Sequence, residues 1–301
     1  MDQYCTTQNL KNSSREAYEG MAKNIINFMG NLALKDVKPS HLSEFVTSRG
    51  DTVSASTVRS YRLLRMCMAD AELTGLLERT PFARHRAPKY PRSEESRFLT
   101  SEEVRLLLAA ADGSRLQRPL AFMLATGVRS SELFALRKSD LHLEADVPYV
   151  TIRHNVRTSN GTPEWGDAKT VNGLRSIDLS PTTVDVIKAH LGTLMLEQMK
   201  SYRWDDESLL FPSTVGSVWD YKNFRKLWDR IVKDSGIAHA SPHSTRHTHA
   251  SHSIAAGEQV FYLSRRLGHS AVSQTYDTYG HLLKGGQEIS AHAMDEFLQA
   301  V

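Results

Sequence analysis

Residues 242–248 read PHSTRHT, a segment that combines two imidazoles with one guanidinium group. Three further segments carry related side chains. Residues 125–133 read ATGVRSSEL, residues 267–270 read LGHS, and residues 277–282 read DTYGHL. Together the four segments supply two arginines, several histidines and a tyrosine in a fixed order along the chain.

These side chains suit the cleavage of a phosphodiester without a metal ion. Attack on phosphorus adds negative charge to the non-bridging oxygens, and metal ions or fixed donors must neutralise that charge. Arginine donates forked hydrogen bonds to such oxygens in a geometry that lysine cannot copy. A phenol has a pKa near ~10, so an attacking tyrosine needs a base, and an imidazole titrating near ~6.5 is suited to that task.

The four segments resemble the motifs of the tyrosine recombinase (phage integrase) family, which read T-G-x-R-x-x-E-L, H-x-x-R-H-T, L-G-H-S and Y-x-H-L. Residues 168–170 (AKT) and 175–179 (RSIDL) are similar to the family's lysine hairpin. The resemblance covers roughly residues 98–290 by motif and the N-terminal third by general pattern. Thr245 departs from the pattern, because the family usually has an apolar residue there, but the change removes no chemical group.

The resemblance implies a role for each polar side chain of these motifs. Arg129 and Arg246 would bind the scissile phosphate, and His269 would add a further donor. His243 would take the phenol proton, and Lys169 would protonate the departing 5′ oxygen. Glu132, one turn from Arg129, would orient that arginine or a neighbouring histidine. The implied catalytic set, with no cofactor and no metal ion, is Arg129, Lys169, His243, Arg246, His269 and the nucleophile Tyr279.

Two tyrosines compete for the role of nucleophile. Tyr276 and Tyr279 are three residues apart, so on a helix they point about 60° apart and both could face one groove. The Tyr-x-His-Leu context fits only Tyr279, and Tyr279 follows His269 by ten residues, as in phage-type members of the family. We therefore expect Tyr279 to be the nucleophile.

A dense run of histidines raises the alternative of a metal site. His243 and His247 have the i,i+4 spacing of a zinc pair, and the neighbouring histidines are His239, His249 and His252. The segment lacks the glutamate of the H-E-x-x-H motif, and Arg246 would place a cation beside a bound metal. We therefore predict no metal.

Composition is compatible with a nucleic-acid partner. The chain has 301 residues, which is enough for one large domain or two smaller ones, and it carries a net charge of +3. The positive excess lies in the first third, which holds 15 Lys and Arg against 11 Asp and Glu up to Arg97. Two cysteines, Cys5 and Cys67, suggest reduced thiols. The chain has no long apolar run and no signal-like N-terminus, so we expect a soluble, intracellular protein without a membrane partner. The resemblance implies that it acts on DNA in the cytoplasm of a bacterial host cell.

Apolar periodicity predicts a mainly α fold with a small antiparallel β-sheet. Two short strands, Val147–Arg153 and Arg175–Leu179, bracket a polar excursion that carries Lys169 near its tip or on the strand edge after it. Arg129 should lie at a junction between two helices, after Gly127. Helices are expected at Ser14–Met29, Ser56–Leu73, from Thr100, through Leu120–Leu124, from Pro181, at Tyr221–Asp234, Ser244–Ala255, Glu258–Leu267, near Tyr279 and around Glu288–Leu298.

Basic residues in the first third predict DNA contacts. Arg59, Arg62 and Arg65 form a ridge on one predicted helix, and such ridges anchor helices to phosphates. The segment 84–97 is rich in proline and charged residues, which predicts a linker. Arg175 is expected to pair with backbone or an acid, with a phosphate contact as the alternative. The linker residues included among the DNA contacts are Arg84, Arg86, Lys89 and Arg92.

These features predict three parts of the chain. Residues 1–83 would form a helical core-type DNA-binding domain, 84–97 a basic linker, and 98–301 a catalytic domain ending in a C-terminal helix. By resemblance, the two domains would clamp around DNA. The short segment before Ser14 leaves little room for an arm-type DNA-binding domain.

The resemblance implies a site-specific recombinase, an integrase that inserts and excises a phage or other mobile element through a 3′-phosphotyrosine. It would act on double-stranded attachment or core sites as a homotetramer, with a directionality factor as a further candidate partner. The alternatives are a resolvase or dimer-resolution recombinase, a type IB topoisomerase, a catalytically silent DNA-binding protein and a metal-dependent nuclease.

Overall fold

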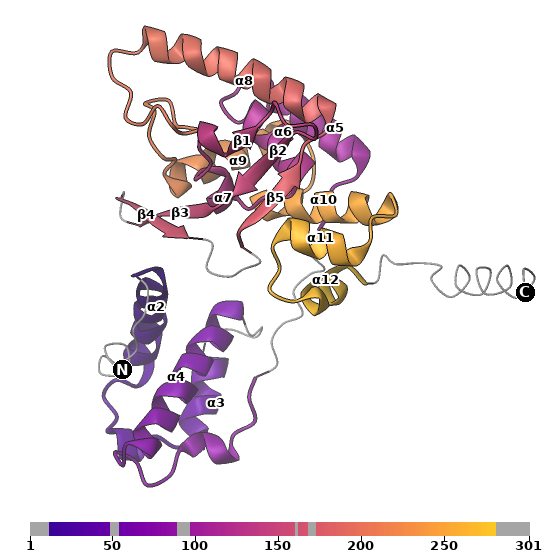
Figure 1. Ribbon diagram of the computed structural model, residues 1–301. Helices are drawn as coiled ribbons and strands as arrows, with labels where there is room; N and C mark the ends of the chain where they lie inside the picture. The colour runs from indigo at the N-terminus through magenta and orange to yellow at the C-terminus, as the bar shows by residue number, and fades with distance from the viewer. Residues whose placement is uncertain (1–11, 49–53, 89–96, 160–161, 168–172, 281–301) are drawn as a thin grey trace, which may run out of the picture. The chain divides into compact units, whose positions relative to one another are not determined.

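The computed structural model describes residues 12–48, 54–88, 97–159, 162–167 and 173–280. The chain divides into two compact units, Met1–Glu95 and Ser96–Val301. Both are drawn in Figure 1, with the helices and strands labelled as below. In the described part of the chain, no helix is both long enough and apolar enough to cross a membrane.

The N-terminal unit is helical. Pro39 opens one of its helices, and Ser54 begins another by accepting a hydrogen bond from the backbone N–H of Thr57 at 3.1 Å. The aromatic rings of Tyr61 and Phe82 pack edge to face in its core, with centroids 5.1 Å apart. Its elements are α2 (Asn12–Met29), η1 (Leu34–Asp36), α3 (Pro39–Thr47), α4 (Ala55–Leu73) and η2 (Pro81–Arg84).

The second unit combines helices with short strands. Some of its helices begin at polar caps, as at Thr100, whose hydroxyl accepts from the N–H of Glu103, and at Ser180, which accepts from Thr183. The helices are α5 (Ser101–Ala110), α6 (Gln117–Thr126), α7 (Ser130–Leu133), α8 (Pro181–Lys200), α9 (Tyr221–Asp234), α10 (Pro242–Ala255), α11 (Val260–Leu267) and α12 (Val272–Tyr279), with a 3-10 turn η3 (Lys138–Asp140).

The strands of this unit form two antiparallel sheets. In the first, the strand order is β1-β2-β5, and Val150 of β2 pairs with Ile177 of β5. Both side chains are buried, so this sheet turns one face toward the core. The second sheet is the hairpin of β3 and β4. The strands are β1 (Leu141–His142), β2 (Tyr149–Ile152), β3 (His154–Ser159), β4 (Thr162–Asp167) and β5 (Arg175–Asp178).

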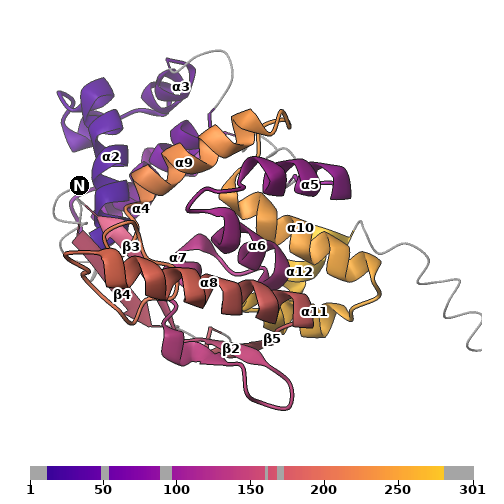
Figure 2. The ribbon, with the colours of Figure 1, turned by 90° about the horizontal axis from the view of Figure 1, so that it is seen from above.

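The core of the second unit forms around α6. This helix packs against α8 and α10, and Figure 2 shows it between the two. Gly127 ends α6 with a φ of +67°, a left-handed backbone conformation that residues other than glycine rarely adopt. A Cβ at this position would come within 2.7 Å of the His249 ring. The glycine therefore allows the chain to turn tightly against α10.

The structure confirms the predicted fold class, mainly α with small antiparallel sheets. The two predicted strands pair with each other, and the excursion between them contributes a hairpin of its own. Helix α3 was missed, because it is too short to show a clear apolar period. The C-terminal helix expected around Glu288–Leu298 lies outside the described residues.

Candidate active site

Helix α10 supplies the central cation of the site. Arg246 is almost fully buried, with 1% of its surface exposed. Its guanidinium donates to the backbone carbonyl of Gly127 at 2.9 Å and to that of Leu267 at 2.5 Å. These carbonyls lie at the ends of α6 and α11, so three helices hold the arginine in place. Burial and the nearby Arg129 lower the pKa of Arg246 to about 9, which leaves it charged at neutral pH.

Thr245, the one departure from the expected motif, is also buried on α10. Its hydroxyl donates to the carbonyl of Pro242 at 2.8 Å, within the same helix. The polar group is therefore satisfied locally, and the side chain occupies the core position without an unpaired hydroxyl.

Arg129 lies where it was expected, at the junction between α6 and α7. Its backbone N–H and its Nη1 both donate to the carboxylate of Glu132, each at 2.9 Å. Glu132 is buried and bridges to a second arginine, because Arg175 Nη2 donates to its Oε2 at 2.8 Å. Burial alone would raise the pKa of Glu132, but the charges and hydrogen bonds of Arg175 and Arg129 lower it to about 2.

Arg175 has its hydrogen-bonding groups engaged inside the unit. Besides Glu132, it donates from Nε to the carbonyl of Arg266 at 2.6 Å. Its surface is 9% exposed. From the sequence, we included Arg175 among the DNA contacts and also expected its side chain to pair with backbone or an acid. The observed hydrogen bonds correspond to the pairing with backbone and an acid.

His269 follows Gly268, which ends α11 in the left-handed conformation with a φ of +66°. The imidazole is buried, and its Nδ1 lies 2.7 Å from the hydroxyl of Thr275 on α12. Burial and the charges of Arg246 and Arg129 lower the pKa of His269 to about 3. The ring is therefore neutral at neutral pH and joins α11 to α12.

The two candidate nucleophiles differ in placement. Tyr279, near the end of α12, is 4% exposed, whereas Tyr276 is 52% exposed. Burial raises the pKa of Tyr279, and the charges of Arg246 and Arg129 act in the opposite direction. The phenol thus lies within the electrostatic field of both arginines of its own chain.

The hydroxyl of Tyr279 is hydrogen-bonded to His247 Nδ1 at 2.7 Å. His243, the base expected from the sequence, contacts His247 edge to face, with ring centroids 4.6 Å apart. Sequence reasoning considered His247 only as a possible zinc partner of His243. The signal that could have singled it out is its position one turn after His243, on the same helix face.

The histidine run does not form a metal site in the part of the chain that the structure describes, where no group of three potential ligands is found. His249 faces the core and bonds through Nδ1 to the carbonyl of Leu124 at 3.0 Å. Of the i,i+4 pair, His243 contacts His247, and His247 in turn faces the ring of Tyr279.

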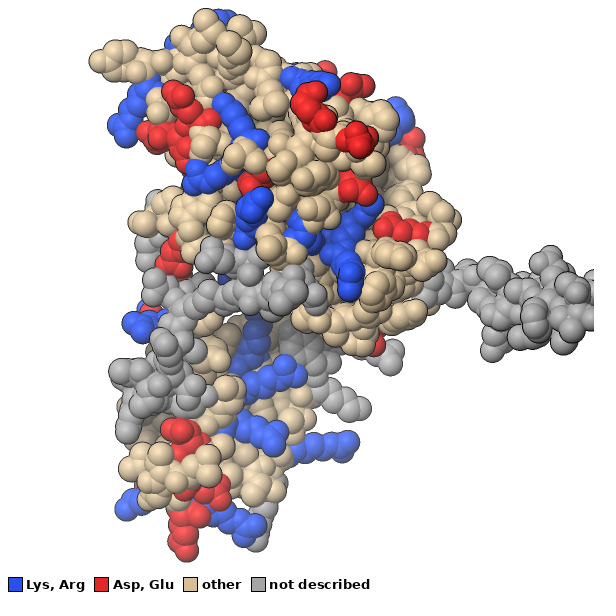
Figure 3. Space-filling model, viewed as in Figure 1, with Lys and Arg blue, Asp and Glu red and all other residues tan. Residues whose placement is uncertain are grey.

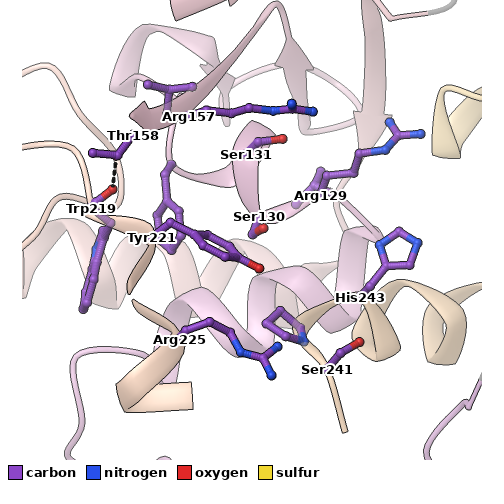
Figure 4. Close-up of a pocket in the computed structure, with 14 residues that line it drawn as sticks. Arg129, Ser130, Ser131, Arg157, Thr158, Trp219, Tyr221, Arg225, Ser241 and His243 are labelled. Carbon is purple, nitrogen blue, oxygen red and sulfur yellow. Dashed lines mark hydrogen bonds between the residues drawn. The ribbon is translucent and has the colours of Figure 1, made fainter. Parts of the chain in front are cut away.

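A pocket of about 550 Å³ adjoins these residues. Figure 4 shows Arg129 and His243 side by side at one end of it. Val128, Phe134 and Trp219 contribute apolar walls. Further polar groups on its rim are Ser130, Ser131, Arg157, Thr158, Tyr221, Arg225 and Ser241.

The expected DNA contacts of the N-terminal unit are partly described. Arg59, Arg62 and Arg65 are exposed along α4, and Arg86 is exposed beyond η2. Figure 3 shows Lys and Arg side chains gathered on one face of this unit. The Arg84 side chain, Lys89 and Arg92 lie outside the described residues, as does Lys169, the expected general acid.

Comparison with known proteins gives a consistent result. Residues 97–285 match the phage integrase family, and residues 1–48 match the N-terminal SAM-like domain of phage integrases. An integrase of Streptomyces ambofaciens is 24% identical over 285 residues, which is 91% of this chain and 72% of that protein. A XerC-like tyrosine recombinase of Caldanaerobacter subterraneus is 25% identical over 205 residues, 63% of this chain and 51% of that protein. The chain thus spans between half and three quarters of the length of these relatives.

The fold also matches a solved structure. The Tn1549 transposon integrase in complex with a circular intermediate DNA superposes with a TM-score of 0.79, at 19% identity, covering 99% of this chain and 97% of that one. At this level of identity the match demonstrates a shared fold.

Proposed function

We propose, from the premise that the chain belongs to the phage integrase family of tyrosine recombinases, that it is an integrase of a phage or other mobile element. The observation that carries the proposal is the position of Tyr279, buried in the field of Arg246 and Arg129 of the same chain. A nucleophile and its charge-stabilising groups thereby belong to one site.

The scissile phosphate would lie between the two arginines. Arg246 is held by two backbone carbonyls and Arg129 by Glu132, so both guanidinium groups are oriented before DNA binds. Fixed donors of this kind stabilise the charge of a transition state without reorganisation. His243 and His269 would add donors to the non-bridging oxygens, and Glu132 with Arg175 would position Arg129.

The reaction would exchange one ester for another. The Tyr279 oxygen forms a bond to phosphorus, the bond from phosphorus to the 5′ oxygen breaks, and the 3′ phosphate becomes linked to the tyrosine. The 5′ oxygen takes a proton, for which Lys169 is the candidate donor. The 5′ hydroxyl of a second strand then reverses the steps, and no ATP or divalent metal is required because the number of ester bonds does not change.

Double-stranded attachment or core sites would be the substrates, inside a bacterial host cell. The N-terminal and catalytic units would clamp the duplex. The ridge of Arg59, Arg62 and Arg65 on α4 (the α4 ridge) and the basic linker would contact the phosphates. Exchange between two duplexes needs four protomers, so we propose a homotetramer on DNA, and a directionality factor would bias insertion against excision. The solved Tn1549 complex, which contains a circular intermediate DNA, supports a mobile-element substrate.

A second candidate within the same chemistry is the resolution of chromosome or plasmid dimers. The similarity to a XerC-like recombinase favours it. The two candidates differ in their DNA, because dimer resolution joins two identical sites, whereas integration joins two different ones.

The test begins by selecting duplexes that the protein retains from a randomised pool. Nicked substrates built on the selected sequence trap the covalent intermediate, since the short fragment that carries the 5′ hydroxyl diffuses away. We expect a protein–DNA adduct on a denaturing gel in excess EDTA. Absence of an adduct, or cleavage only with added Mg²⁺ or Zn²⁺, contradicts the proposal.

A further inference from the structure

We propose that His247 is the catalytic residue that takes the proton from Tyr279 during attack on DNA. The inference rests on the proposed function and assigns the proton to a different imidazole from the one that the motif resemblance implies. Its basis is the hydrogen bond between the Tyr279 hydroxyl and His247 Nδ1, whose heavy atoms lie 2.7 Å apart. That distance is within the reach required of a general base.

Packing holds the two groups together. His247 lies on α10 beside the buried Arg246, and Tyr279 lies on α12, which is attached through Thr275 to His269. The rings of His247 and Tyr279 are 5.7 Å apart between centroids and tilted by 57°. Because Tyr279 is almost completely buried, its hydroxyl is held in this contact rather than solvated.

His243 has a different environment. Its ring meets His247 edge to face, and its other neighbour in Figure 4 is Arg129, at the end of the pocket. Arg129 is one of the proposed phosphate ligands. His243 is therefore positioned to donate to a phosphate oxygen, whereas His247 is the imidazole that contacts the phenol.

The proton balance of the step is simple. With its own proton on Nε2, neutral His247 presents a lone pair at Nδ1, and the Tyr279 hydroxyl donates to it. As the phenol oxygen bonds to phosphorus, its proton moves to Nδ1 and His247 becomes an imidazolium. When the 5′ hydroxyl of the partner strand attacks, the tyrosine oxygen leaves and recovers this proton.

The charges around His247 connect this step to DNA binding. Burial, together with His243 and Arg246 on the same helix, lowers the pKa of His247 to about 4, so the imidazole is neutral before DNA arrives. Tyr279 faces it from α12, and Arg129 also acts on the phenol. A bound phosphate adds negative charge beside the arginines, which raises the proton affinity of His247. The phenol would therefore keep its proton until a substrate is present.

The test compares two replacements of His247 on the nicked substrate described above. His247→Asn can place an amide oxygen near the position of Nδ1, so it keeps an acceptor for the phenol but no base. His247→Ala removes both. We expect each to slow adduct formation by about 10²–10⁴-fold. His252→Gln, an exposed histidine toward the other end of α10, is the matched control and should retain the unmodified rate.

A fluorinated tyrosine incorporated at position 279 separates proton transfer from positioning. Its phenol is more acidic and needs less help from a base. We expect it to restore most of the rate of His247→Asn but not of His243→Asn, while DNA retention by all variants stays near that of the unmodified protein.

Three results would overturn the assignment. The first is a rate for His247→Asn within a few-fold of that of the unmodified protein. The second is a slow His247→Asn variant that the acidic phenol does not restore, and the third is restoration of His243→Asn instead. If the unmodified protein itself forms no adduct, it is the proposed function that fails.

Discussion

Glu132 and Arg175 form a buried ion pair in which Nη2 lies 2.8 Å from Oε2 and the side chains are 9% and 6% exposed. The pair connects α7 with β5, and its two residues are 43 positions apart in sequence. Since Glu132 also holds the backbone and side chain of Arg129, one carboxylate couples the stability of the unit to the geometry of the proposed phosphate site.

Removing this carboxylate should destabilise the catalytic unit. Glu132→Ala leaves Arg175 buried without a counter-charge, and breaking such a pair costs about 3–5 kcal/mol. Urea unfolding followed by tryptophan fluorescence measures the change in stability, because all four tryptophans lie in this unit. Glu102→Ala removes an exposed partner of Arg105 and should leave the midpoint nearly unchanged. Equal midpoints for the two variants would contradict the role of the pair.

Stability should fall in acid, in two overlapping ranges. The folded pKa of Glu132, about 2, lies below its ordinary value of 4.5, so its contribution is complete above about pH 4.5 and is lost as the pH falls toward 2. The depressed pKa values of His247 and His269, about 4 and 3, reduce stability as the pH falls below 6.5. Glu132 alone accounts for about 3 kcal/mol.

Urea midpoints measured from pH 7 to pH 3 test this dependence. Glu132→Gln should flatten the part of the curve below pH 4.5 and leave the part between pH 6.5 and 4.5. A variant curve parallel to that of the unmodified protein throughout would show that Glu132 does not contribute.

Replacing Tyr279 with Phe should abolish the covalent adduct and leave DNA affinity nearly unchanged, because only the attacking oxygen is removed. Tyr276→Phe, a matched change at an exposed position of the same helix, should still form adduct. Denaturing gels of the trapped reactions distinguish the two. The reverse pattern would identify Tyr276 as the nucleophile.

Cleavage should occur in cis, with each protomer attacking the phosphate held by its own arginines. The reason is that Tyr279 contacts His247 and lies in the field of Arg246 within one chain. In a mixture of Tyr279→Phe and Arg129→Ala proteins, every protomer lacks either the phenol or a complete phosphate site, so no adduct is expected. An adduct on the Arg129→Ala chain would demonstrate attack in trans.

The α4 ridge should account for part of the salt dependence of binding. Replacing Arg59, Arg62 and Arg65 with Gln should weaken binding to all sequences. It should also lower the slope of log K against log salt by about 0.9 for each arginine that neutralises a phosphate. Arg203→Gln, which removes an exposed arginine paired with Asp205, is the control. An unchanged slope of log K against log salt in the triple variant would contradict phosphate binding by these arginines.

Local interactions made much of the fold predictable from the sequence. Helices α2, α4 and α9 begin and end close to their predicted bounds, and α8 begins at the predicted Pro181, since a helix depends on residues within one or two turns. The pairing of β2 with β5 followed from two apolar segments around a polar excursion. The order of the motif residues also came directly from the chain.

Sequence by itself therefore determined the family, the class of fold and the side chains available for chemistry. Only the tertiary structure decided which partners those side chains take. The contact between His247 and Tyr279 spans 32 residues, and that between Arg246 and Gly127 spans 119. Five histidines lie between residues 239 and 252, and the spacing of His243 and His247 places both on one helix face without showing which of the two meets the phenol. That choice depends on how α12 packs against α10, which is set by contacts between distant segments rather than by neighbours in sequence.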